Sequence, residues 1–334
     1  MSARLRVAVV LGPTLRNELF GPAEWEELAA LVDIVADCHD SQALALHPMR
    51  AEIEVLITSW GMPQLTDDFL RELPSLRVIA HAAGSVRKLV SDAVWDRGIT
   101  VISAADANNE PVAEYVYAQT VLALKDVHRR THRIKTEAEL PPLDHIPGIY
   151  RQTVGLISFG SVARKAAALL RRLDTHVVAW DPFVPDDAFS RFQVARATSI
   201  DELFSQAQVL SIHTPLIPGQ TEQLISEHLI RRLPYGATLI NTARGAVVDE
   251  EGLIRVLHQR PDLYAVLDVT TLEPLPASSA LYTLPNVMLT GHVAGTVGAE
   301  RRGMGTLVLT ELQRISTGAA PQHAVSPRAL LLRA

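Results

Sequence analysis

Three side chains in the second half of the sequence have the chemistry of a site that binds a carboxylate and transfers a proton: Arg244, Glu273 and His292. A guanidinium is a permanently charged fork, so Arg244 would suit two-point binding of an α-keto-carboxylate. His292 exchanges a proton near neutral pH, and Glu273, 19 residues earlier (292 − 273), would favour its protonated form. Carbonyl reduction requires that form. An arginine beside a glycine is also commonly a surface or capping residue.

These residues follow short apolar runs that are typical of buried strands, at 209–212, 238–241, 265–268 and 287–290. The carboxyl ends of parallel strands form one edge of a sheet, and ligands bind beyond that edge. We therefore expect a row of functional groups there. Its members are His213, Thr214, Pro215, Asn241, Thr242, Arg244, Asp268 and His292.

The segment 153–181 predicts a βαβ unit that binds a dinucleotide. An apolar strand leads into the turn 158–161, a helix follows, and a second strand ends on Asp181, 21 residues after Gly160 (181 − 160). Such a turn directs unpaired N–H groups at a pyrophosphate, and the later carboxylate accepts hydrogen bonds from a ribose diol. Because an acid repels a ribose phosphate, Asp181 favours NAD over NADP.

The glycine motif of this unit is altered to S-x-G-x-x-A. Ala163 is a mild change, since the third position needs only a small side chain. Ser158 occupies the tight turn, where a side chain would strain the loop or displace the cofactor. Taken alone, the motif is also compatible with any open α/β domain.

The first hundred residues predict a second, smaller parallel-sheet domain. Strand-like runs at 5–11, 53–58 and 77–82 alternate with helical stretches at 22–31 and 66–73. The loops after the second and third runs are candidate pocket walls. The residues concerned are Trp60, which is equally compatible with ordinary packing, and Gly84 with Ser85, where exposed N–H groups or a plain turn are both possible.

The segment 108–111 predicts the start of an apolar helix that runs over about 112–127. A basic cluster follows it. Nucleic-acid binding is one interpretation, but cations at a helix C-terminus complement its dipole, which favours a solvent-facing role. The cluster comprises Arg129, Arg130, Arg133 and Lys135.

Composition narrows the class of protein. The chain has 334 residues, 48% of them hydrophobic, a net charge of −6 and a pI near 6.1. These values predict two domains and no general attraction to nucleic acid or membrane. No signal peptide or spanning segment is apparent, so we expect a cytoplasmic protein. Cys38 is the only cysteine, and no metal-binding motif is present, so no metal site is expected.

Several segments resemble the D-isomer-specific 2-hydroxyacid dehydrogenase family, which includes phosphoglycerate dehydrogenases and glyoxylate/hydroxypyruvate reductases. The resemblance covers nearly the whole chain, and the run 239–253 is its most specific part. The segments are TVGLISFG at 153–160, WDP at 180–182, HTPLIPGQTEQLI at 213–225, LINTARGAVVDEEGL at 239–253, LDVTTLEPLP at 267–276 and GHVAG at 291–295.

The resemblance implies hydride transfer between NAD(H) and a 2-keto or D-2-hydroxy acid. Arg244 would hold the substrate carboxylate, with His292 as acid/base and Glu273 as its partner. Asp268 and the Thr242 backbone would face the nicotinamide carboxamide. The implied cofactor site comprises Ser158, Gly160, Ser161, Val162, Asp181, His213, Thr214, Pro215, Thr242, Asp268 and Gly295, and the substrate site comprises Trp60, Gly84, Ser85 and Arg244.

The resemblance also implies an α/β protein with two open parallel-sheet domains, a Rossmann cofactor domain inserted in a flavodoxin-like substrate domain. The expected substrate domain comprises residues 1–106 and 300–334, and the cofactor domain comprises residues 107–299. Family members are commonly dimers through the cofactor domain, so a homodimer is implied. A dinucleotide-sensing protein like the C-terminal-binding-protein corepressors, which share this fold, is the alternative.

Two departures from the family pattern stand out. Arg87 and Lys88 occupy the places of a usual Asp-Asn pair in the substrate loop, and Gly291 replaces the proline that commonly precedes the histidine. The basic pair would either meet a second anionic group on the substrate or lie in solvent.

Overall fold

The chain folds into two compact units, which a computed structural model describes over residues 4–331. Unit 1 holds residues 1–109 and 296–334, and unit 2 holds residues 110–295. Unit 2 is therefore inserted into unit 1 along the sequence. The limits expected from the sequence, 107 and 299, lie three and four residues outside these (110 − 107; 299 − 295).

Unit 1 is built on a six-stranded sheet in the order β13-β5-β4-β3-β1-β2. Neighbouring strands are parallel, except that β13 runs antiparallel to β5. Sequence patterns predicted β1, β3 and β4 and missed the others. The strands are β1 (Arg6–Val10), β2 (Asp33–Cys38), β3 (Val55–Thr58), β4 (Val78–His81), β5 (Thr100–Ser103) and β13 (Ala324–Val325).

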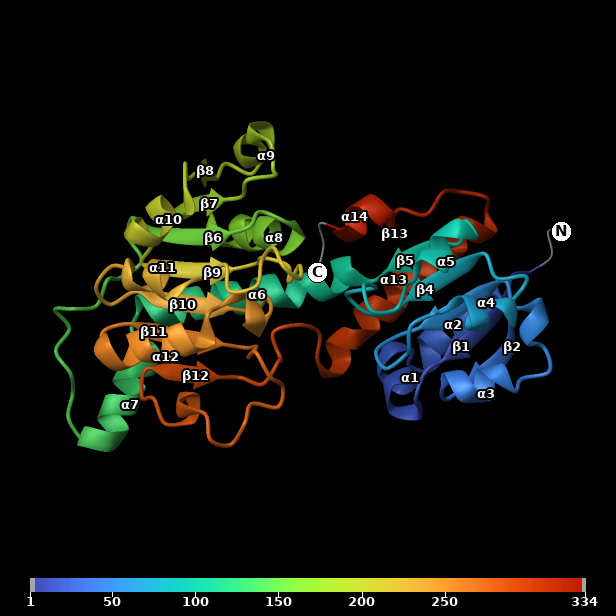
Figure 1. Ribbon diagram of the computed structural model, residues 1–334, viewed down its shortest axis with the longest axis horizontal. Helices are drawn as coiled ribbons and strands as arrows, with labels where there is room; N and C mark the ends of the chain where they lie inside the picture. Colours follow the sequence, from blue (N-terminus) through green and yellow to red (C-terminus); the bar gives the residue numbers. More distant parts are fainter. Residues whose placement is uncertain (1–3, 332–334) are drawn as a thin grey trace. The chain divides into compact units, whose positions relative to one another are not determined.

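Helices cover both faces of this sheet, because its central strands are apolar on both sides. One apolar cluster holds Leu19, Leu28 and Met304, and the other holds Leu44 and Leu70. The helices of the first face are α1 (Pro13–Leu19), α2 (Pro22–Leu31) and α13 (Arg302–Ser316). Those of the second are α3 (Ser41–Ala45), α4 (Asp67–Arg71) and α5 (Asp92–Asp96), and α14 (Pro327–Leu331) follows β13 (Figure 1).

Unit 2 is built on a seven-stranded parallel sheet in the order β12-β11-β10-β9-β6-β7-β8. The chain reverses its direction of winding between β6 and β9, which places the topological switch point at the centre of the sheet. The strands are β6 (Gln152–Ile157), β7 (Thr175–Trp180), β8 (Ala195–Arg196), β9 (Val209–Ile212), β10 (Thr238–Asn241), β11 (Tyr264–Leu267) and β12 (Val287–Leu289).

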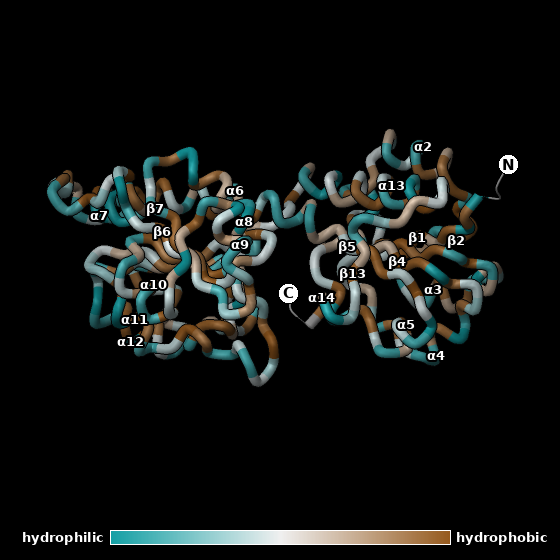
Figure 2. Tube along the Cα trace, turned by 90° about the horizontal axis from the view of Figure 1, so that it is seen from above, coloured by the Kyte–Doolittle hydropathy of each residue, from teal (hydrophilic) through white to brown (hydrophobic). Residues whose placement is uncertain are grey.

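Two apolar clusters sandwich this sheet as well, and Figure 2 shows hydrophobic residues along the strands of each unit. Leu203, Leu229 and Val256 belong to one cluster, and Leu124 and Ala167 belong to the other. The helices are α6 (Ala105–Leu124), α7 (Val127–Glu137), α8 (Ser161–Leu170), α9 (Asp186–Arg191), α10 (Ile200–Gln206), α11 (Glu227–Arg231) and α12 (Glu250–Gln259). The predicted α/β class with two parallel sheets is confirmed.

The predicted start of the long apolar helix is wrong. Helix α6 begins at Ala105 rather than at about 112, and Pro111 lies inside it. The Ser103 hydroxyl accepts a hydrogen bond from the Ala105 N–H at 3.1 Å and so starts the helix earlier. Asn108 does not cap, because its Oδ1 accepts from the Thr296 N–H at 3.1 Å and the Thr296 hydroxyl at 3.0 Å.

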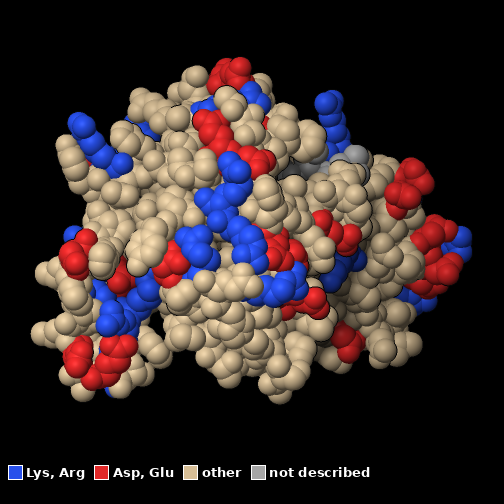
Figure 3. Space-filling view, turned by 60° about the vertical axis from the view of Figure 1, so that its left-hand side comes forward, with Lys and Arg blue, Asp and Glu red and all other residues tan. Residues whose placement is uncertain are grey.

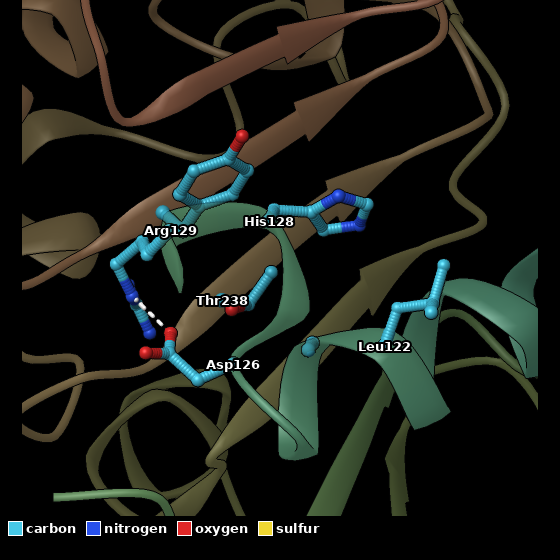
Figure 4. Close-up of a pocket in the computed structure, with 7 residues that line it drawn as sticks. Leu122, Asp126, His128, Arg129 and Thr238 are labelled. Atoms are coloured by element: carbon cyan, nitrogen blue, oxygen red, sulfur yellow. Dashed lines mark hydrogen bonds and ion pairs between the residues drawn. The ribbon is translucent and has the colours of Figure 1, made fainter. Parts of the chain in front are cut away.

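The basic cluster after this helix serves mainly to hold unit 2 together. Arg129 donates to Asp126 at 2.5 Å and to the carbonyls of Asp262 and Gly236 at 2.7 and 2.8 Å (Figure 4). Its side chain is only 17% exposed, so the prediction of a solvent-facing role is wrong for Arg129. Arg133 pairs with Glu137 on the surface, as expected.

Arg129 and Asp126 line a small cavity (Figure 4). Its volume is about 10 Å³, which is enough for one water molecule. Thr238 and Tyr264 also line it, and they are the first residues of β10 and β11. The cavity therefore lies at the amino edge of the sheet, opposite to the edge expected to bind ligands.

Candidate active site

The imidazole of His292 contacts the carboxylate of Glu273 on unit 2. The distance from His292 Nδ1 to Glu273 Oε2 is 2.9 Å, and the two side chains are 51% and 42% exposed. Both residues lie in loops beyond the carboxyl ends of β11 and β12. A carboxylate at Nδ1 orients the ring and leaves Nε2 for proton exchange with a ligand.

Arg244 follows β10 and is half-buried. It donates to the carbonyl of Ala243 at 2.5 Å. Burial lowers the pKa of the guanidinium, and the Glu273 carboxylate partly offsets that effect. Because an arginine pKa starts far above neutral, the group remains a cation that a substrate carboxylate can pair with.

Gly245 explains how Arg244 and Glu273 come close. A Cβ atom at position 245 would lie 1.9 Å from the carbonyl carbon of Thr270 and 2.2 Å from the nitrogen of Thr271. The loop after β10 therefore touches the backbone of the loop that carries Glu273. Only glycine permits this approach.

The backbone that presents His292 is left-handed at two successive residues. Gly291 has φ 71° and His292 has φ 64°. A proline, whose φ is confined near −65°, cannot adopt the geometry of Gly291. At position 291 glycine therefore permits a left-handed backbone that the proline of the family pattern would not permit.

Asp268, at the end of β11, holds this backbone in place. Its carboxylate accepts hydrogen bonds from the Thr290 hydroxyl at 2.6 Å, the Val293 N–H at 2.8 Å and the Ala294 N–H at 3.0 Å. Its carbonyl accepts from the His292 N–H at 2.7 Å. The residue is 2% exposed, so the structure uses most of its acceptor capacity for the loop.

The altered glycine turn begins with a strained residue. Ser158 has φ 68°, in the left-handed region that glycine adopts freely. Its hydroxyl lies 2.9 Å from that of Thr214, which follows β9. This contact stabilises the strained turn and links two predicted cofactor residues across the switch point.

The N-terminus of α8 follows this turn and is open. Gly160 is its N-cap, no described side chain caps it, and a Cβ at Gly160 would meet nothing within 4 Å. Ser161 and Val162 form the first turn. The N-terminus of a helix is the positive end of its dipole, which suits a pyrophosphate.

Asp181 lies at the end of β7 and is 8% exposed. It accepts hydrogen bonds from the Phe159 N–H at 2.8 Å, the Phe183 N–H at 2.8 Å and the Val184 N–H at 3.2 Å. A carboxylate has about four acceptor positions, so one is left for a ribose hydroxyl rather than the two that the sequence suggested. A cavity of about 440 Å³ adjoins it, lined by Trp180, Pro182, Arg196, Ala197 and Thr198.

His213 and Thr242 each carry a buried polar atom that the described residues leave without a hydrogen-bond partner. His213 Nε2 and Thr242 Oγ1 have no hydrogen-bond partner within residues 4–331. Burial lowers the pKa of His213 to about 4, so its ring is neutral at pH 7. Together with the open helix end, these atoms fit a bound dinucleotide. Pro215 follows β9, two residues after His213, and Gly295 is the last residue of unit 2.

Unit 1 carries three of the four predicted substrate residues, Trp60, Gly84 and Ser85, whereas Arg244 lies on unit 2. Trp60 is 45% exposed and lies under the guanidinium of Arg301, 5.4 Å from the ring centre. The Gly84 carbonyl accepts from the Ser103 hydroxyl at 2.5 Å. Ser85 is half-buried. Ser103 and Arg301 carried no sequence signal, because their partners are distant in the chain.

Arg87 and Lys88, the basic pair of the predicted substrate loop, differ in exposure and in contacts. Lys88 is exposed, whereas Arg87 is half-buried and donates to the carbonyl of Leu330 at 2.5 Å. On the face shown in Figure 3, basic and acidic side chains lie next to one another. Arg231 and Arg255, for example, both pair with Glu227.

Within the described part of the chain, no group of three or more His, Cys, Asp or Glu residues is arranged to hold a metal ion. The helices described there are also too short or too polar to cross a membrane.

The fold and the site together define the class of NAD-dependent dehydrogenases with a Rossmann domain. Residues 117–294 match the family described as D-isomer specific 2-hydroxyacid dehydrogenase, NAD binding domain. The chain therefore belongs to the D-isomer-specific 2-hydroxyacid dehydrogenases, a family of oxidoreductases that transfer a hydride between NAD(H) and 2-keto or 2-hydroxy acids. NAD is the cofactor of this domain.

Two relatives illustrate this membership. The chain is 30% identical to the (S)-sulfolactate dehydrogenase of Chromohalobacter salexigens over 87% of its own length and 96% of that protein. It is 26% identical to the D-3-phosphoglycerate dehydrogenase of Methanocaldococcus jannaschii over 82% of its length, but spans only 52% of that longer protein.

Solved structures share the fold. A phosphoglycerate oxidoreductase from Rhizobium etli superposes with a TM-score of 0.81 at 19% identity, covering 96% of this chain and 98% of that one. The NAD-complexed D-isomer specific 2-hydroxyacid dehydrogenase of Lactobacillus delbrueckii ssp. bulgaricus has a TM-score of 0.78 at 22% identity, covering 96% and 100%.

The close approach at Gly245 yields a stability prediction. Gly245→Ala should lower the free energy of unfolding by about 1–3 kcal/mol, since the methyl group forces two loops apart. Urea unfolding measures the change. Gly303→Ala is the matched control, because a Cβ there meets nothing within 4 Å. Equal unfolding midpoints for Gly245→Ala and the unaltered protein would contradict the packing argument.

Proposed function

We propose that this protein reduces a 2-keto acid to a D-2-hydroxy acid with NADH and catalyses the reverse reaction. The observation that carries the proposal is the 2.9 Å contact between His292 and Glu273, with Arg244 close enough for the Glu273 charge to influence its pKa. A site with these three groups can bind a carboxylate and exchange a proton beside a nicotinamide.

Each residue has one task in the proposed reaction. Arg244 binds the substrate carboxylate and polarises the carbonyl. His292, oriented by Glu273, donates a proton from Nε2 to the carbonyl oxygen. When bound, NADH supplies the hydride for the carbonyl carbon, so the products are the hydroxy acid and NAD⁺. In the reverse direction His292 takes the hydroxyl proton back.

Relatives suggest which substrates to test. Some carry names for sulfolactate, phosphoglycerate and glyoxylate or hydroxypyruvate. A panel of the corresponding 2-keto acids with pyruvate, assayed by NADH oxidation, tests the proposal directly. Tight NADH binding without turnover of any acid would instead favour the dinucleotide sensor. We assign Trp60, Gly84 and Ser85 to substrate binding, and the panel also tests whether exposed Lys88 favours a second anionic group.

A homodimer through unit 2 is part of the proposal. The segment between α7 and β6 contains no helix or strand (Figure 1). It exposes large apolar side chains. Leu140 is 82% exposed, Leu143 is 71% exposed and Tyr150 is 66% exposed. A second copy of this chain would cover such a surface. We also infer a cytoplasmic location, where the NADH pool is available.

The first prediction of this proposal concerns the catalytic residues. His292→Ala should lower kcat by about 10²–10⁴-fold while NADH binding survives, because general acid catalysis contributes that much. Arg244→Lys should be nearly as damaging, since a point charge does not replace a bidentate fork. Steady-state kinetics and NADH fluorescence titration measure the two effects. Near-normal turnover in either variant refutes the mechanism.

The second prediction concerns the cofactor. The unaltered protein should have a higher kcat/KM with NADH than with NADPH, because the Asp181 carboxylate repels a 2′-phosphate. Asp181→Asn removes the charge and keeps the size of the side chain, so it should narrow the ratio. Equal values for the two cofactors in the unaltered protein would show that Asp181 does not discriminate.

The third prediction concerns the dimer. Leu143→Glu should convert a dimer into a monomer in sedimentation velocity, because a charge at the apolar surface opposes burial. Leu46→Glu is the matched control, since Leu46 is 84% exposed on unit 1. A monomeric unaltered protein, or a Leu143→Glu variant that stays dimeric, would rule out this interface.

A further inference from the structure

Arg87 of the proposed substrate loop reaches the C-terminal helix of the same unit. Its guanidinium donates to the carbonyl of Leu330, 243 residues further along the chain, at 2.5 Å. We propose that Arg87 is a positioning residue through which helix α14 sets the shape of the substrate loop 84–88. The inference deepens the proposed function and rests on it.

The loop end of this contact is well defined. The Arg87 N–H donates to the Ser85 hydroxyl at 3.3 Å, and the Gly84 carbonyl accepts from Ser103 at 2.5 Å. Gly84 is also packed against Asn108, whose amide nitrogen would lie 3.5 Å from a Cβ at position 84. The loop is therefore bound at its start to Ser103, next to Asn108, and at its end through Arg87 to Leu330.

On the other side of this contact, α14 is also held in place. Val325 and Leu330 pack against the apolar cluster that also contains Val86 and Leu89, the neighbours of Arg87 in sequence. The strand before α14 pairs with β5. The C-terminal helix and the substrate loop therefore pack against the same apolar cluster, and the hydrogen bond from Arg87 to the Leu330 carbonyl connects them directly.

An arginine suits this position for a physical reason. The last carbonyls of a helix have no partner within the helix, and a cation there also complements the helix dipole. Leu330 is the penultimate residue of α14, so its carbonyl is one of these. The guanidinium satisfies that carbonyl.

This role predicts an effect on substrate binding rather than on chemistry. Arg87→Ala should raise KM for the best 2-keto acid by roughly tenfold, the order of effect that loss of one charged hydrogen bond produces. The value of kcat and the Kd for NADH should be unchanged, because the proton- and hydride-transferring residues lie on unit 2. Arg87→Lys should recover part of the loss.

The experiment compares steady-state kinetics and hydrogen exchange for four proteins: the unaltered chain, Arg87→Ala, Arg87→Lys and Arg71→Ala. Arg71 is the matched control, since it lies in the same unit, is 67% exposed and pairs only locally with Asp67 and Asp68. Exchange is followed in the peptide that contains residues 327–331. Arg87→Ala should accelerate exchange there, and Arg71→Ala should not.

The outcomes are distinct. A raised KM with faster exchange in Arg87→Ala supports the inference. An unchanged KM in an active Arg87→Ala variant overturns it, and so does unchanged exchange. If the unaltered chain reduces no 2-keto acid, the proposed function fails, and the exchange measurement still decides whether Arg87 holds α14.

Discussion

The carboxylate of Asp268 organises the backbone that carries His292. A buried carboxylate needs several donors, and here the peptide groups of Val293 and Ala294 and the Thr290 hydroxyl supply them. Those bonds hold the loop directly after Gly291 and His292, which both have a left-handed backbone. Together with the hydrogen bond from the His292 N–H to the Asp268 carbonyl, they keep His292 in an unfavourable conformation and in contact with Glu273. The contact between His292 and Glu273 therefore depends on the Asp268 carboxylate, whose own bonds are to the loop.

A second buried carboxylate binds backbone N–H groups at the predicted cofactor turn. Asp181 follows β7 at the same edge of the sheet, is buried and accepts hydrogen bonds from three backbone N–H groups, one in the turn after β6 and two in its own loop. The strained Ser158 lies beside this turn. Each left-handed non-glycine residue of the site thus has a buried carboxylate near it. The energy of these charged hydrogen bonds offsets a backbone strain of about 1–3 kcal/mol.

Basic side chains follow a related rule in the rest of the molecule. For both Arg129 and Arg87 the sequence left two interpretations, contact with an external anion or exposure to solvent, and both side chains donate instead to main-chain carbonyls of distant segments. An arginine has five donors and a long stem, so it readily satisfies the carbonyls that helix ends and strand starts leave open. Arg129 in this way ties α7 to the amino edge of the unit 2 sheet, and Arg87 ties α14 to the substrate loop.

Local pattern predicted two parallel sheets, although only three of the six strands of unit 1, and it predicted the βαβ unit around the turn 158–161, because strand hydrophobicity and the βαβ spacing are properties of short segments. It also indicated that Ser158 would strain its turn, which the φ of 68° bears out. The start of α6, the use of Asp181 and Asp268 by the backbone, and the partner of Arg87 were decided by tertiary structure. Each depends on groups far apart in the chain, such as Ser103 with Gly84 or Arg87 with Leu330, and no spacing within a segment encodes which distant carbonyl a side chain will meet.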